Sequence, residues 1–293
     1  MSPAWLLGLV LAASSTSYVR SRVETATPGD PAAHCLWWKA GTIGFSQNQL
    51  GNPDVPGEAG FSAVAAGFGA WDAQSSKCGN FHLEEKGRTA RKDVGYDPAA
   101  SDNLNIVLFR SQSCRDKVPS GDSCWSESDC NNRYDCWQYT AATIGLTTTT
   151  YDRKTGQIYD ADMELNAANF KMTTVDAPPC AAGLGTACVS SDVQNTVSHE
   201  VGHLLGLDHA PDPRSTMFAS APIGETSKRT LDDGSRAFVC EVYPAGRDSQ
   251  DCVLTPVGES LGPRASCSAV GGDTGGAWLL LGALAAARRR GAR

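Results

Sequence analysis

The stretch HEVGHLLGLDH, from His199 to His209, restricts the fold more than any other part of this sequence. His199 and His203 stand four residues apart, and in an α-helix that spacing places both imidazoles on one face. Gly206 is placed to end the helix, so that the chain can turn and bring His209 towards the other two. The pattern therefore predicts a helix with two metal ligands and a third ligand in the turn that follows.

The predicted helix begins near Ser191, which can cap it, with Gln194 as the second half of a capping box. Its apolar stripe consists of Val193, Val197, Val201, Leu204 and Leu205. Glu200 points to the flank of the ligand pair, where a carboxylate is suited to accept a proton from metal-bound water. Three neutral imidazoles leave one tetrahedral position open, which is typical of catalytic zinc. The alternative is a buried helix whose histidines have ordinary hydrogen-bond partners.

The segments before this helix predict an α+β scaffold. Residues 60–74 carry apolar side chains at helical spacing and predict an amphipathic helix. Three strands are predicted after it, at residues 80–85, 103–109 and 142–152. Residues 157–166 alternate, with one polar face that predicts a half-exposed strand near a sheet edge: Asp160, Asp162, Glu164 and Asn166. The order of helix, strands and histidine helix is an α+β arrangement.

Eleven cysteines in 293 residues indicate disulfides and an oxidising compartment. A thiolate metal site ranks below disulfides, because the sequence contains no CxxC pair. Two short loops are candidate bridges, one between Cys180 and Cys188 and one between Cys240 and Cys252. Residues 113–137 hold four cysteines and predict a disulfide-stapled insertion.

The ends of the chain predict export. Residues 4–13 form an apolar run of signal-peptide length, too short to span a membrane, and we expect residues 1–17 to be a signal peptide. Residues 18–34 are predicted to be a short leader, residues 35–257 one domain, and residues 258–293 a linker and sorting tail. The net charge of −7 argues against nucleic acid as a partner.

The tail has a cysteine, Cys267, followed by a glycine-rich spacer, a short apolar run at residues 277–287 and an arginine cluster. This layout resembles the MYXO-CTERM sorting tail of myxobacterial surface proteins. The resemblance implies that Cys267 is the processing and lipid-attachment point, and that the membrane is reached only through this tail or anchor. It places the protein outside the cell or on the outer membrane of a Gram-negative bacterium. The alternative is a disordered tail.

The longer pattern HExxHxxGxxH, with Met217 after it, resembles the metzincin metallopeptidases and among them the matrixins. The resemblance covers roughly residues 35–243. It implies a metzincin (zincin) fold, which is a twisted mixed sheet over two helices with a cleft between two subdomains. It also implies one catalytic Zn²⁺ held by His199, His203 and His209, with Met217 beneath it as packing.

The sequence departs from these families in several places. Matrixins commonly carry a second, structural zinc bound mainly by histidines, but only His34 and His82 remain outside the motif, so we predict that this site is absent. Ala210 stands where matrixins have serine, and Ala219 stands where astacins and serralysins have tyrosine. Ca²⁺ has only weak candidates, for which a solvated face is the favoured interpretation: Asp152, Asp160 and Asp162.

The predicted activity is that of a secreted or surface-anchored zinc endopeptidase, a monomer acting on protein or peptide substrates. Zinc-activated water would attack the peptide bond, with Glu200 as the general base. An extended substrate would add along residues 157–166, and residues 218–224 would wall the pocket just past the scissile bond. The alternatives are a non-catalytic, metal-stabilised surface or adhesion module, and a zinc hydrolase of non-peptide substrates.

Overall fold

The computed structural model describes residues 18–25, 27, 30–181 and 185–252, and its centre is a five-stranded mixed sheet. The strands lie in the order β3-β2-β4-β6-β5, and only β5 runs antiparallel to its neighbour. Their bounds are β2 Gly41–Asn48, β3 Phe81–Thr89, β4 Asn105–Arg110, β5 Gly145–Tyr151 and β6 Ile158–Asn166. The α+β class and the mixed sheet are therefore confirmed.

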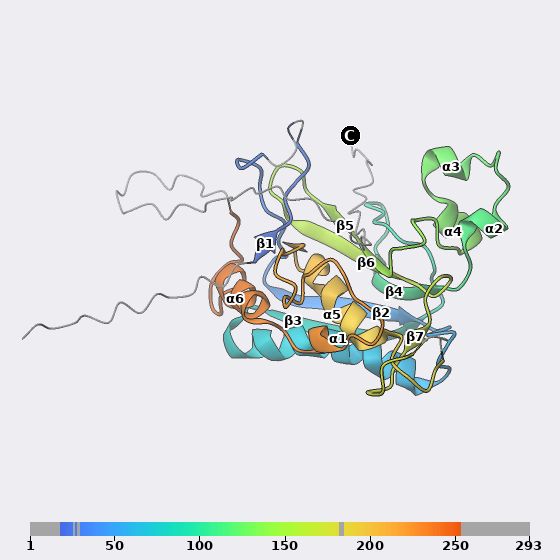
Figure 1. Ribbon diagram of the computed structural model, residues 1–293. Helices are drawn as coiled ribbons and strands as arrows, with labels where there is room; N and C mark the ends of the chain where they lie inside the picture. Colours follow the sequence, from blue (N-terminus) through green and yellow to red (C-terminus); the bar gives the residue numbers. More distant parts are fainter. Residues whose placement is uncertain (1–17, 26, 28–29, 182–184, 253–293) are drawn as a thin grey trace, which may run out of the picture.

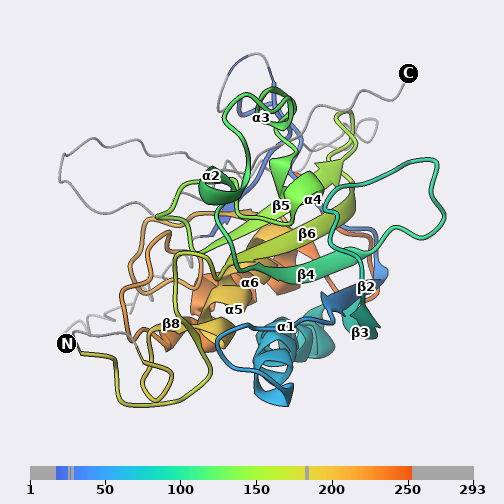
Figure 2. The same cartoon turned by 90° about the vertical axis from the view of Figure 1, so that its right-hand side faces the viewer.

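Two helices cover one side of this sheet. They are α1 (Glu58–Cys78) and α5 (Val193–Leu204), and Figures 1 and 2 show both on the same side. The two helices approach closely because Gly67 has no side chain, and a Cβ there would lie 2.6 Å from Val197 Cγ1. Phe68 of α1 stacks on Phe45 of β2 with ring centroids 3.7 Å apart. The core therefore lies between the sheet and this pair of helices.

The start of α5 differs from the predicted capping box. Ser191 lies in a short strand, β8 (Ser191–Asp192), which pairs with β7 (Met172–Thr173). This pairing keeps the backbone extended for one more residue, so Asp192 becomes the cap and accepts a hydrogen bond from the backbone N–H of Asn195 at 2.7 Å. The predicted cap at Ser191 is therefore wrong by one residue.

The predicted half-exposed strand at residues 157–166 is buried, and its expected use as the sheet edge is also wrong. Strand β6 lies between β4 and β5, so β5 is the edge strand on this side of the sheet. The polar side chains of β6 are buried, because loops and β4 supply polar partners on that face. The carboxylate of Glu164 accepts from Arg110 Nε at 2.7 Å, and Asp162 accepts from the backbone N–H of Ile106 at 2.9 Å. The solvated face expected for Asp160 and Asp162 does not exist.

The cysteine-rich insertion forms a small layer of its own, with disulfides Cys114–Cys136 and Cys124–Cys130. It contains α2 (Cys114–Lys117), α3 (Cys124–Glu127) and α4 (Cys130–Tyr134), which lie together at the upper right of Figure 1. The predicted disulfide-stapled insertion is confirmed. On the side nearest the sheet, Arg110 Nη1 binds the carboxylate of Asp135 at 2.9 Å.

The remaining disulfides correct one prediction. The bridge between Cys180 and Cys188 is confirmed. The bridge between Cys240 and Cys252 is wrong, because the structure pairs Cys78 with Cys240 and Cys35 with Cys252. Helix α6 (Asp233–Val242) packs on α1, and this contact brings Cys240 next to Cys78 at the end of α1. Cys267, the predicted signal peptide and the predicted sorting tail lie outside the described residues.

The first described residues pack against the segment that follows α5. Strand β1 (Val19–Arg20) pairs antiparallel with β9 (Leu207–Asp208), and Ser21 donates its backbone N–H to Gly206 O at 2.9 Å.

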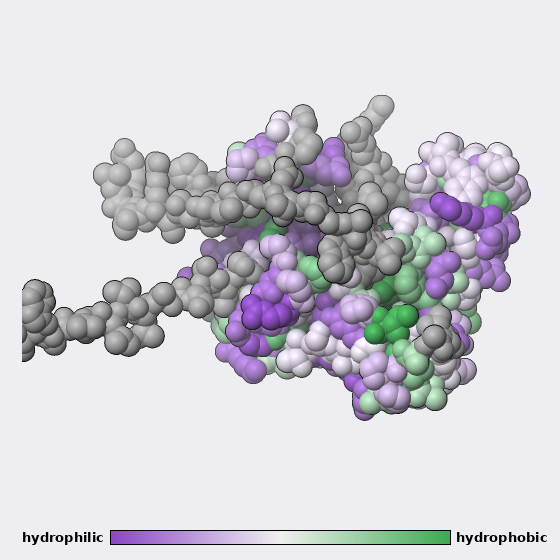
Figure 3. All heavy atoms as spheres, in the orientation of Figure 1, coloured by the Kyte–Doolittle hydropathy of each residue, from purple (hydrophilic) through white to green (hydrophobic). Residues whose placement is uncertain are grey.

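On the face drawn in Figure 3, hydrophobic and hydrophilic residues are interspersed. Among the described helices, none is long and apolar enough to cross a membrane.

Candidate metal centre

The three histidines of the motif meet at one point. His199 and His203 project from α5, and Gly206 then ends the helix with φ +99°, a left-handed conformation that favours glycine. A Cβ on Gly206 would also lie 2.5 Å from the carbonyl oxygen of Leu36, so the turn has no room for a side chain. After this turn His209 comes back to the helix. The Nε2 atoms of the three histidines lie 3.2–3.3 Å from one another.

Hydrogen bonds on the far side of the rings fix which nitrogen faces the centre. His199 Nδ1 lies 2.7 Å from the carbonyl oxygen of Thr216, and His203 Nδ1 lies 2.8 Å from that of Leu207. A carbonyl only accepts, so both Nδ1 atoms carry the proton and both Nε2 lone pairs point inward. Burial lowers the pKa of all three histidines, that of His203 to about 4, which keeps the rings neutral.

This donor set fits a zinc ion. Tetrahedral zinc with Zn–N bonds of about 2.0–2.1 Å places its ligand nitrogens about 3.3 Å apart, close to the separations found here. Among the described residues, the group that could hold a metal at this point consists of the three histidines alone. Three neutral imidazoles without a fourth protein ligand are the donor set of catalytic zinc sites.

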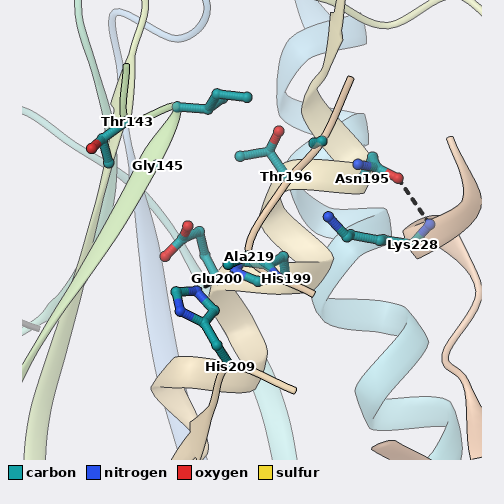
Figure 4. Close-up of a pocket in the computed structure, with 11 residues that line it drawn as sticks. Thr143, Gly145, Asn195, Thr196, His199, Glu200, His209, Ala219 and Lys228 are labelled. Atoms are coloured by element: carbon teal, nitrogen blue, oxygen red, sulfur yellow. Dashed lines mark hydrogen bonds between the residues drawn. The ribbon is translucent and has the colours of Figure 1, made fainter. Parts of the chain in front are cut away.

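Glu200 lies beside the histidines, between α5 and the edge strand β5. Its Oε2 accepts a hydrogen bond from Thr147 Oγ1 at 2.8 Å. Its Oε1 packs against Gly145, where a Cβ would lie only 2.7 Å away. Burial raises the pKa of Glu200 to about 7. The hydrogen bond from Thr147 and the positive charge of Lys228 both lower this pKa, but burial has the larger effect. In Figure 4 the carboxylate of Glu200 points into the same pocket as His199 and His209.

Met217 is buried below this centre, against α5. A Cβ on Gly202 would lie 2.1 Å from Met217 Sδ, so the sulfur occupies the space that this glycine leaves on the helix. The backbone carbonyl of Met217 accepts from the N–H of Ala210 at 2.9 Å, and the preceding residue, Thr216, holds His199. The turn at residues 215–218, here called the methionine turn, thus ties the two histidine-bearing segments together.

A pocket lies beside the histidines and Glu200. Ala219 and Ala221 line it, in agreement with the prediction that residues 218–224 form a wall. Lys228 also lines it, although nothing in the sequence points to this residue. It lies in the short 3-10 helix η1 (Ser227–Arg229), whose place is set by tertiary contacts, since Asn195 Oδ1 accepts from the backbone N–H of Lys228 at 2.8 Å.

The chain resembles a known peptidase family over part of its length. A peptidase family model described as matrixin matches residues 121–244. The matched segment includes β5, β6, α5, the three histidines and the methionine turn. The match supports a zinc-dependent, matrixin-like metallopeptidase, for which protein or peptide is the expected substrate. No curated protein matches the chain.

Proposed function

We propose that this protein is a zinc endopeptidase that hydrolyses internal peptide bonds. The observation that carries the proposal is the convergence of three inward-facing Nε2 atoms beside the buried carboxylate of Glu200. His199, His203 and His209 would hold a single zinc ion. Met217 would support the centre by packing, since its sulfur lies against Gly202.

Zinc held there supplies Lewis acidity, which acidifies water and polarises the scissile carbonyl. Glu200 takes the proton from the attacking water and delivers it to the leaving amine. Thr147 restricts this carboxylate by donating to Oε2 at 2.8 Å, while Oε1 remains on the Gly145 side. A carboxyl whose pKa lies close to the working pH is suited to take up and release a proton in the same cycle.

The substrate would add to the outer edge of β5, not to residues 157–166. In the described part of the chain β5 pairs with β6 only, so one side of its backbone offers N–H and C=O groups to an extended peptide. Its first residue, Gly145, contacts Glu200, so a peptide on this edge would pass the proposed general base.

The test is cleavage of an unfolded protein by the wild type and by Glu200→Ala, with the zinc content of both measured. We expect the variant to retain zinc and to lose at least 100-fold in kcat/KM, which corresponds to the usual contribution of a general base. A zinc-loaded wild type that cleaves no protein or peptide library would refute the proposal and favour a metal-stabilised binding module. Equal cleavage by Glu200→Ala would refute the assigned role of Glu200.

We also propose that the protein works outside the cytoplasm as a monomer. Five disulfides suggest an extracellular environment. In this proposal residues 1–17 are a signal peptide, residues 35–257 are the catalytic domain, and Cys267 is the attachment point on the outer membrane. Mass spectrometry of the mature protein tests the tail, because an intact chain ending at Arg293 would contradict processing at Cys267.

A further inference from the structure

Lys228 places a buried cation in the wall of the pocket beside the metal centre, and the proposed mechanism does not use it. Its side chain is 3% exposed. Figure 4 shows its Nζ pointing into the pocket, towards the side on which Glu200 lies. On the β5 side the pocket is lined by Thr143, Ile144 and Gly145, and the segment after Met217 adds Ala219 and Ala221. A buried ammonium facing such a cavity is costly unless it has a partner.

The backbone that carries this lysine is held by the start of α5. The backbone N–H of Lys228 donates to Asn195 Oδ1 at 2.8 Å. The next residue, Arg229, donates from Nε to the capping carboxylate of Asp192 at 2.8 Å. Because η1 is held at two points on α5, the lysine needs little reorganisation to meet a ligand in the pocket.

The ammonium keeps hydrogen-bonding capacity that the protein does not use. It has three N–H donors, and one of them binds the carbonyl oxygen of Ser220 at 2.7 Å. Glu225 Oε2 lies 3.5 Å away, beyond the 2.7–2.9 Å of a charge-assisted hydrogen bond. Glu225 therefore balances part of the charge, but a donor remains for the cavity. The other charged or titratable groups within the electrostatic reach of Lys228 are Glu200, His199 and His209.

We propose that Lys228 selects an acidic side chain, Asp or Glu, on the residue that follows the cleaved bond. This inference rests on the proposed peptidase function. The pocket opens beside Glu200, which would protonate the leaving amine, so the side chain that enters it belongs to the leaving-amine side. A carboxylate there gains a charge-assisted hydrogen bond from the remaining donor of Lys228. An apolar side chain covers that donor without offering it an acceptor, and a basic side chain is repelled.

The experiment compares peptides that differ only in this residue, carrying Glu, Gln, Leu or Lys. For the wild type we expect kcat/KM for the Glu peptide to exceed that for the Gln and Leu peptides by about tenfold or more, with the Lys peptide cleaved least. Lys228→Met should abolish this order. Lys86→Met is the matched control, because Lys86 pairs with Glu84 on β3, at the opposite edge of the sheet from β5.

Two additions keep the test decisive. Lys228→Met leaves the carboxylate of Glu225 without its cation, so Lys228→Met/Glu225→Gln serves as the second variant if the first is poorly folded. Binding is measured separately by calorimetry with non-cleavable peptide hydroxamates that carry a carboxylate or an isosteric carboxamide in this position. We expect about tenfold tighter binding of the carboxylate by the wild type, and equal binding of both by the variant.

The outcomes separate the two proposals. A wild type that cleaves the Leu peptide as well as the Glu peptide overturns the selectivity and leaves the peptidase function standing. A preference for Glu that survives Lys228→Met overturns the role of this lysine. If zinc-loaded protein cleaves none of the peptides and no other protein substrate, the peptidase proposal fails and the selectivity fails with it.

Discussion

Replacement of Gly202 by alanine tests how the methionine turn supports the histidines. Gly202 lies on α5 between Glu200 and His203, and a Cβ on it would lie 2.1 Å from Met217 Sδ, 2.9 Å from Met217 Cε and 3.2 Å from Trp71 Cζ2. Ordinary non-bonded contacts are about 3.5–4.0 Å. The sulfur must therefore retreat by roughly 1.5 Å or more, in a core where Met217 is 1% exposed.

The expected loss of stability combines two opposing effects. Overpacking of a filled core costs about 1–3 kcal/mol, and a clash with two buried side chains belongs at the upper end of that range. Alanine gains about 1 kcal/mol over glycine in the interior of a helix. The net destabilisation is then about 1–2 kcal/mol, which lowers Tm by roughly 2–8 °C for a domain of this size. Because Thr216 precedes Met217 and holds His199, zinc affinity should fall by about tenfold or more.

The assay is thermal unfolding of zinc-loaded protein together with a zinc titration against a competing chelator. Gly69→Ala is the matched control, since Gly69 lies in α1 and a Cβ there would meet nothing within 4 Å, and this change should raise stability by up to about 1 kcal/mol. The packing argument is refuted if Gly202→Ala behaves like Gly69→Ala and binds zinc as the wild type does. In a double-mutant cycle of Gly202→Ala with Met217→Ala, the two losses in the free energy of unfolding should not be additive, because the Met217 side chain occupies the space that a Cβ on Gly202 would need.

Other changes probe the rest of the structure. Removal of zinc by a chelator should lower Tm, and added zinc should restore it, because the ion binds the folded state; scanning calorimetry measures both. Thr147→Val should lower kcat/KM by about 10-fold to 100-fold at unchanged zinc content, because Glu200 loses the hydroxyl that orients it. Burial raises the pKa of Asp160 to about 6. Protonated Asp160 therefore stabilises the fold fully below about pH 4, and this stabilisation is lost as the pH rises through about 6. In urea unfolding, the free energy of unfolding of Asp160→Asn should fall less between these pH values than that of the wild type. Replacement of Cys78 and Cys240 by serine should lower the free energy of unfolding by about 2–5 kcal/mol, since that bridge closes a loop of 162 residues. Denaturant unfolding of the double variant measures this loss.

The local part of the site could be predicted from the sequence, because its geometry follows from helical spacing. His199 and His203 share a face of α5 for that reason, and Gly206 has the left-handed φ that the turn requires. Lys228 could not be predicted, because it reaches the pocket through the packing of η1 on Asn195.

The place of residues 157–166 in the sheet could not be predicted because alternation has two explanations. A strand with one polar face is usually half-exposed. Here the polar face meets a second layer, in which Arg110 is fully buried and binds both Glu164 and Asp135. The sequence shows the polar residues but not their partners, since Arg110 and Glu164 lie 54 residues apart.

The disulfide between Cys35 and Cys252 determines how mechanical tension on the described chain is distributed. A pull between Tyr18 and Cys252 passes through this covalent bridge, so everything between the two cysteines is shielded from the load. The load falls on residues 18–34 alone, whose first strand, β1, pairs with Leu207–Asp208 next to His209. If the protein is held at a surface by its C-terminal end, as proposed, traction on residues 18–34 would peel β1 away from Leu207–Asp208 and remove the strand that pairs next to His209, while the chain between the two cysteines carries no load.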